Sequence, residues 1–169
     1  MPHIVLLGDS VFDNAAYVRP GEPDVVRQLR ARLPAGAKAT LAAVDGATAA
    51  DVRRQLERLP ADATHLIVSA GGNDALGNIG VLDEAADSIA VALTRLAVTG
   101  LVLFNDVITR AAFAHGLPVL DLRLICDEDA DFANPIEPSA QGGDKIAAAI
   151  ARLVAEHDFG RRRSEVFVC

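Results

Sequence analysis

The stretch HIVLLGDSVFDN, residues 3–14, joins a short apolar run to a polar turn and decides the fold class of this chain. Residues 4–7 are aliphatic without a break, which is typical of a strand buried on both faces, as in a parallel sheet. Gly8-Asp9-Ser10 follows at once, and the glycine gives the backbone the freedom that a sharp turn requires. The stretch therefore predicts a first strand that delivers a serine hydroxyl to one edge of a sheet.

Two further strand patterns follow, at residues 39–44 and 65–69. Helical patterns over residues 23–33 and 48–59 separate the strands, and Thr48 is a plausible cap for the second helix. This β-α-β-α-β order with short connections predicts a parallel sheet with helices on both faces. In such folds, ligands bind at the loops that follow the carboxyl ends of the strands.

The second half of the chain is less regular. Helical patterns at 82–98 and 101–115 precede a strand at 117–122 and a last helix that Ser139 can cap. A doubly wound sheet would normally have a strand between the first two of these patterns. Either residues 101–104 supply it, or residues 117–122 pair directly with the third strand, or a partner chain fills the gap. A missing interior strand would leave backbone groups unpaired.

Length and composition limit the class of protein. The 169 residues suggest a single domain, which we place at 1–158 with a C-terminal tail at 159–169. The net charge of −7 argues against a nucleic-acid partner, and the basic run at 161–163 is expected to be a solvated part of the tail. With no signal-peptide pattern and no apolar run of about 18–20 residues, we expect a cytoplasmic protein without a membrane partner.

Neither the two cysteines nor the four histidines lie at the spacing of a metal site. We therefore expect no metal and no cofactor. Nothing in the composition decides whether the chain is a monomer or a dimer.

Three polar groups that can take part in acyl transfer each follow a predicted strand. Taken singly, Ser10 could be a helix cap, Gly46 a turn glycine and Asn73 part of an Asx turn. Together they offer a hydroxyl, a backbone N–H and a side-chain amide at one edge of the sheet. These are the parts of a nucleophile and an oxyanion hole.

The motifs GDS at 8–10, VDGAT at 44–48, GGND at 71–74 and NPIEPSAQGGDKIA at 134–147 resemble those of the SGNH hydrolases, also called GDSL esterases and lipases. The resemblance spans most of the chain and implies a flavodoxin-like three-layer α/β/α fold with strand order 2-1-3-4-5. It implies that Ser10 attacks an ester or acetyl carbonyl. The oxyanion would then be held by the N–H of Ser10, the N–H of Gly46 and the amide of Asn73. We also expect Asp9 and Asp74, the acidic residues of two motifs, to bind substrate.

One motif departs from the family pattern of Asp-x-x-His before Pro-Ser. Here Asn134 stands at the aspartate position and Glu137 at the histidine position, which resembles a subgroup with glutamate there. A glutamate has a reference pKa of about 4.3 against about 6.5 for histidine, so it is the weaker base, although burial would raise its pKa. We therefore expect a catalytic set of Ser10, Glu137 and Asn134 with altered chemistry.

Three hypotheses follow from the sequence. The first is a serine hydrolase that acts on small carboxylic esters or O-acyl groups. The second is a catalytically impaired relative that binds a small ligand or a partner at the same cleft. The third is an unrelated flavodoxin-like binder of nucleotide or phosphate, although neither a G-x-G-x-x-G pattern nor a P-loop follows the first strand.

Overall fold

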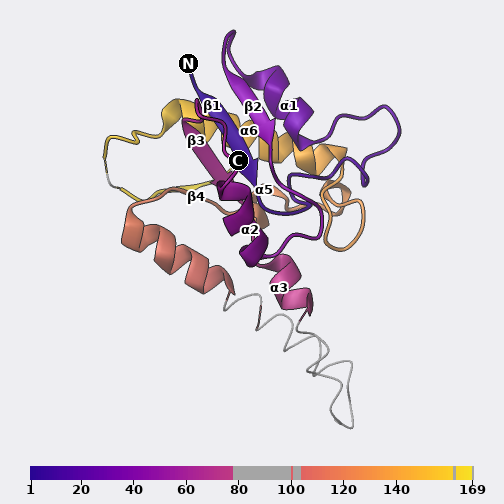
Figure 1. The fold of residues 1–169 in the computed structure, drawn as a ribbon. Helices are drawn as coiled ribbons and strands as arrows, with labels where there is room; N and C mark the ends of the chain where they lie inside the picture. The colour runs from indigo at the N-terminus through magenta and orange to yellow at the C-terminus, as the bar shows by residue number, and fades with distance from the viewer. Residues whose placement is uncertain (78–99, 101–103, 162, 169) are drawn as a thin grey trace.

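The structure is a computed structural model that describes residues 1–77, 100, 104–161 and 163–168 (Figure 1). Its first half contains the elements β1 (His3–Leu7), α1 (Val25–Arg32), β2 (Lys38–Leu41), α2 (Ala49–Leu56), β3 (His65–Val68) and α3 (Gly72–Gly77). After a helix over residues 104–115, the second half contains β4 (Val119–Leu120), α5 (Leu122–Ile125), the 3₁₀ helix η2 (Asp129–Asp131), α6 (Ala140–Glu156) and β5 (Val166–Phe167).

Strands β2, β1 and β3 form one parallel sheet in that order, with β1 in the middle. Val5 at the centre of β1 lies opposite Thr40 on β2 and Leu66 on β3. The order 2-1-3 is the one expected for the first three strands. Because all three strands run the same way, the loops after them meet at one edge of the sheet.

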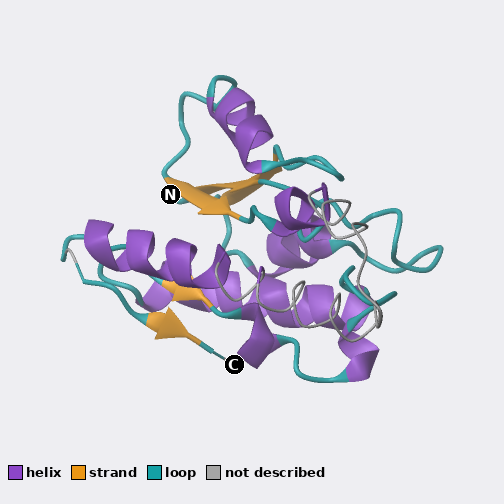
Figure 2. Ribbon diagram, turned by 90° about the horizontal axis from the view of Figure 1, so that it is seen from below, coloured by secondary structure: helices purple, strands orange, loops and turns teal. Residues whose placement is uncertain are grey.

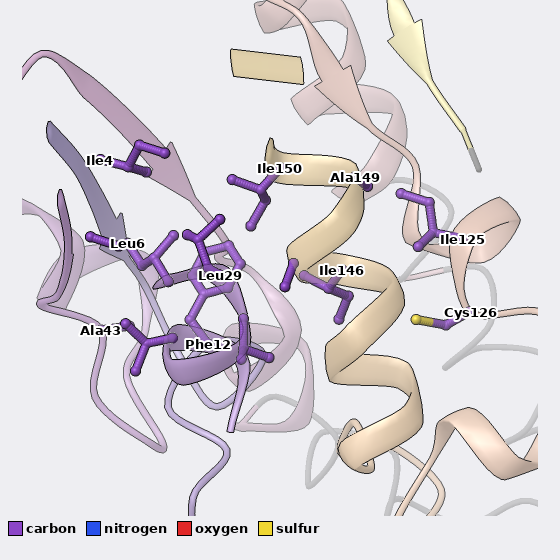
Figure 3. Packing of buried hydrophobic residues seen from close by; sticks show 14 residues of the cluster. Ile4, Leu6, Phe12, Leu29, Ala43, Ile125, Cys126, Ile146, Ala149 and Ile150 are labelled. Carbon is purple, nitrogen blue, oxygen red and sulfur yellow. The ribbon is translucent and has the colours of Figure 1, made fainter. Parts of the chain in front are cut away.

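Helices cover both faces of this sheet because β1 is apolar on both faces. Ile4 and Leu6 pack in one buried cluster with side chains of α1 and α6, while Val5 and Leu7 pack in a second cluster with Val52 of α2. Figure 3 shows Leu6, Leu29 and Phe12 facing the helix that carries Ile146 and Ile150. The predicted three-layer α/β/α fold class is confirmed.

Two predictions about the strands need correction. The second strand ends at Leu41 rather than at residue 44, because Ala42 and Ala43 both donate to the Leu6 carbonyl, which interrupts the regular strand pairing. The predicted strand at 117–122 is reduced to β4, and Leu122 already begins α5.

The proposed direct pairing of residues 117–122 with the third strand is wrong. Val119 lies opposite Val166 and Leu120 opposite Phe167, so β4 and β5 form a two-stranded parallel sheet of their own, apart from the larger sheet in Figure 2. Residues 101–103 lie outside the described residues, as does the helical pattern at 82–98, and residue 104, the last of the candidate strand, is helical.

The boundary at residue 158 stays a prediction, although β5 belongs to the segment that was expected to be a tail. Within it, Arg163 forms an ion pair with Glu165, and Glu165 lies 3.0 Å from Nδ1 of the buried His157. None of the helices among the described residues has the length and apolar character needed to span a bilayer.

A polar cluster ties together the amino ends of the strands, at the opposite edge from Ser10. The buried His3 ring lies 2.8 Å from Asp62 through Nδ1 and 2.8 Å from Thr40 through Nε2. Lys38 donates to the second oxygen of Asp62 at 2.8 Å. Bonds from Lys38 and then His3 lower the pKa of Asp62 to about 2.

Candidate active site

The turn after β1 is held in an unusual backbone conformation that only glycine tolerates at its first residue. Gly8 has φ 123°, and a Cβ on it would lie 1.8 Å from the carbonyl oxygen of Ser69. The loops after β1 and β3 therefore approach each other in direct backbone contact. Ser10 follows as a buried side chain, 7% exposed.

Gln55 of α2 fixes the same turn with both ends of its side-chain amide. Gly8 N–H donates to Gln55 Oε1 at 2.7 Å, and Gln55 Nε2 donates to the Gly8 carbonyl at 2.9 Å. The sequence analysis missed this residue, because nothing in its spacing from residue 8 marks the contact. A side chain of α2, the helix on the second face of the sheet, thus positions the turn that carries Ser10.

Glu137 is the direct partner of Ser10. The serine hydroxyl donates to Glu137 Oε1 at 3.0 Å, although 127 positions separate the two residues. Glu137 is 7% exposed, and its second oxygen, Oε2, is buried without a hydrogen-bond partner among the described residues. Burial raises the pKa of Glu137, the Ser10 hydrogen bond opposes this rise, and the charges of Asp45 and Asp9 add to it.

The backbone of the loop before α6 determines where Glu137 lies. Asn134 Oδ1 accepts the N–H groups of Ile136 and Glu137, both at 3.0 Å, so its side chain acts on the loop backbone. At the end of the loop, Ser139 caps α6 by accepting from Gly142 N–H at 3.2 Å. The predicted cap is present, and the proposed catalytic role of Asn134 stays a prediction.

An ion pair with a buried carboxylate stabilises this loop. Lys145 of α6 donates to Asp131 at 2.8 Å, and Asp131 is fully buried. Burial alone would raise the pKa of Asp131, but bonds from Lys145, the Glu128 N–H and Gln141 outweigh it and lower that pKa. The Asp131 carbonyl in turn accepts the Ser139 N–H at 2.8 Å.

Asn14 joins the serine loop to the glutamate loop. Its side chain is fully buried, donates to the Pro138 carbonyl at 3.1 Å and accepts the Val25 N–H at 3.0 Å. The only sign of this contact in the sequence is that a polar residue, Asn14, lies four positions after Ser10. Because one side chain binds both loops and the start of α1, their relative positions are coupled.

The expected oxyanion-hole residues of the second and third loops lie next to each other. Asn73 Nδ2 donates to the Ala47 carbonyl at 3.0 Å, which places its amide beside Gly46. Gly46 has φ 78°, and no atom lies within 4 Å of where its Cβ would be. One of the two Asn73 N–H groups remains for another acceptor.

The two aspartates expected to bind substrate make contacts within the protein. Asp9 is 4% exposed, and its Oδ1 accepts from Val11 N–H at 3.2 Å and from the Ser69 hydroxyl at 3.0 Å. Asp74 Oδ2 accepts from Ala49 N–H at 2.9 Å at the start of α2. Both hold loops of the site in place, and their binding roles stay predictions.

The described ranges contain no group of three or more histidine, cysteine or acidic side chains that could hold a metal ion.

A comparison with protein families matches residues 6–159 to the model of the GDSL-like Lipase/Acylhydrolase family. The match includes the loops that carry Ser10, Gly46, Asn73 and Glu137. A search of curated proteins found no match.

Proposed function

The chain belongs to the GDSL-like Lipase/Acylhydrolase family, and on that premise we propose that it hydrolyses carboxylic esters or O-acyl groups with Ser10 as nucleophile and Glu137 as base. The observation that carries this proposal is the 3.0 Å hydrogen bond from the Ser10 hydroxyl to a buried carboxylate. A distance of about 2.6–3.2 Å is what a general base needs to accept the proton of its nucleophile.

The reaction would proceed in two steps. As Ser10 Oγ attacks the acyl carbonyl carbon, its proton passes to Glu137, and the carbonyl oxygen becomes an oxyanion near the N–H groups of Ser10, Gly46 and Asn73. Glu137 then gives the proton to the leaving alkoxide, which departs as an alcohol. In the second step, water loses a proton to Glu137 and attacks the acyl-serine. The bond to Ser10 Oγ then breaks, Glu137 returns the proton to Oγ, and the acid is released.

The environment of Glu137 makes up part of the difference from histidine. A general base works best when its pKa lies near the working pH. Burial and the nearby charges of Asp45 and Asp9 raise the pKa of Glu137 and so strengthen it as a base. The same shift makes its protonated form a usable acid for the leaving group.

The test combines covalent labelling with turnover. Wild type is expected to react with a fluorophosphonate at Ser10 and to hydrolyse short-chain nitrophenyl esters, whereas Ser10→Ala does neither. Absence of labelling together with turnover no higher than that of Ser10→Ala would favour a catalytically impaired protein that binds a ligand in the same place. The double variant Asn134→Asp with Glu137→His then asks whether the usual residues restore hydrolysis.

A further inference from the structure

Four carboxylates of the Ser10 loop and the neighbouring loops have no cationic partner among the described residues. Asp9, Asp13, Asp45 and Glu137 take part in none of the ion pairs formed among the described residues, all of which engage other acidic side chains. Elsewhere in the described chain most carboxylates of the fold are paired. Four such carboxylates therefore lie in the loops of one site.

Hydrogen bonds link the chain segments that carry three of these groups, Asp9, Asp13 and Asp45. The Asp45 N–H donates to Asp13 Oδ2 at 3.0 Å, and the Asp13 N–H donates to the Asp9 carbonyl at 3.1 Å. The Tyr17 hydroxyl donates to Asp45 Oδ2 at 2.8 Å. The bond from Tyr17 to Asp45, burial and the charges of Glu137, Asp45 and Asp13 raise the pKa of Tyr17 to about 12, which places its ring within the field of all three carboxylates.

Glu137 supplies a second and independent indication of a ligand site. Its Oε1 accepts from Ser10, and its Oε2 is buried without a hydrogen-bond partner in the part of the chain that the structure describes. A buried carboxylate oxygen left without a donor or a counter-charge is costly, and native proteins rarely retain one without a reason. A positive group bound beside Ser10 would supply the missing counter-charge.

We propose that the natural substrate carries an ammonium group, which binds among Asp13, Asp45 and Glu137 while Ser10 attacks the ester carbonyl. The inference rests on the proposed esterase function and names its substrate class. Carboxylates that form no ion pair among the described residues attract a cation, and the ring of Tyr17 can add a cation–π contact to an ammonium group. A neutral ester of the same shape would gain neither contact.

The test uses a matched pair of esters, the choline ester and the 3,3-dimethylbutyl ester of acetic acid, which differ only by nitrogen in place of carbon. We expect kcat/KM for the choline ester to be higher by about tenfold or more at low salt, since an acidic cleft concentrates cations. The preference should shrink in about 0.5 M salt, because Asp45 is exposed to solvent and its field is screened.

Single-residue variants test whether the preference for the choline ester comes from the carboxylates near Ser10. Asp45→Asn and Asp13→Asn should each reduce the ratio of the two kcat/KM values by about threefold or more, as expected for one nearby charge in partly exposed surroundings. Asp158→Asn removes the same charge beyond the far end of α6, which has 17 residues and is about 25 Å long, and should leave the ratio unchanged.

The outcomes separate the substrate class from the esterase function. Equal rates on both esters, each abolished by Ser10→Ala, would overturn the ammonium inference and leave the esterase intact. If neither ester is hydrolysed, binding of choline against 3,3-dimethylbutan-1-ol by calorimetry decides. Selective binding of choline that Asp45→Asn weakens supports the cation site, and equal or absent binding of both overturns it.

Discussion

Replacing Glu137 by glutamine is the sharpest test of how this site works. Glutamine keeps the size of the side chain and an oxygen that can accept from Ser10, but it cannot take a proton. Ser10 donates to Glu137 at 3.0 Å in buried surroundings, so the carboxylate is positioned as the base. A positioned general base contributes about 10²–10⁴-fold to the rate, which corresponds to about 2.7–5.4 kcal/mol in the barrier.

We therefore expect kcat/KM of Glu137→Gln on a short-chain nitrophenyl ester to fall by about 10²–10⁴-fold, without reaching the level of Ser10→Ala. The pH profile gives a second reading of the same group. Since the proposed base must be ionised and its pKa is raised by burial, wild-type kcat/KM should increase with pH through a midpoint above the ordinary glutamate range. That rise should vanish in Glu137→Gln.

Asp45→Asn is the matched electrostatic variant. The charge of Asp45 raises the pKa of Glu137, so its removal should move the midpoint of the rise to lower pH. Stopped-flow or plate-reader assays between about pH 4 and pH 9 measure all three profiles. A Glu137→Gln variant that keeps most of the wild-type rate, or keeps the same rise with pH, would refute the role of Glu137 as the base.

Three further predictions concern the framework of the site and the sheet. In a urea titration, Gly8→Ala should lower the free energy of unfolding by about 2–6 kcal/mol, because φ is 123° and the new Cβ would clash with the Ser69 carbonyl. The control Gly21→Ala, at φ 93° in open space, should lower it by only about 1–2 kcal/mol. Gln55→Ala should lower kcat more than it changes KM, and should destabilise the fold by about 1–3 kcal/mol because the Gly8 N–H loses its partner. An unchanged kcat would mean that the two hydrogen bonds of Gln55 to Gly8 do not position Ser10. Lys38 and His3 lower the pKa of Asp62 to about 2, so the contribution of Asp62 to stability is complete above about pH 4 and is lost as the pH falls toward 2. Asp62→Asn should remove that part of the acid unfolding transition, and an acid unfolding curve identical to that of wild type would contradict this prediction.

Residue patterns within single helices and strands predicted much of the fold. The unbroken aliphatic run in β1 required a layer on each face, and the structure has α1 and α6 on one face and α2 on the other. The cap at Ser139 also follows from a short-range pattern, whereas the strand order 2-1-3 was implied by the resemblance to the family. Strand ends were less predictable, because residues 42–44 are apolar whether they pair or leave the sheet.

Contacts between distant segments were beyond the sequence. The pairing of β4 with β5 depends on where the chain after α6 returns, and no local pattern records this. The clamp of Gln55 on Gly8 and the bridge of Asn14 to Pro138 each use an ordinary polar side chain whose partner is known only once the layers are packed.

The sequence alone determined which chemical groups stand at the carboxyl edge of the sheet: a hydroxyl at Ser10, an amide at Asn73 and a carboxylate at Glu137 where the family usually has histidine. Only the tertiary structure decided that the carboxylate is buried against the hydroxyl. Within the described ranges, one of its oxygens has no hydrogen-bond partner, and the charges of Asp45 and Asp9 act on it. The physical reason is that residue identity fixes which protons and charges a side chain can carry. Burial, hydrogen bonding and the fields of neighbouring charges, which fix how strongly it holds them, arise only when segments far apart in the chain come together.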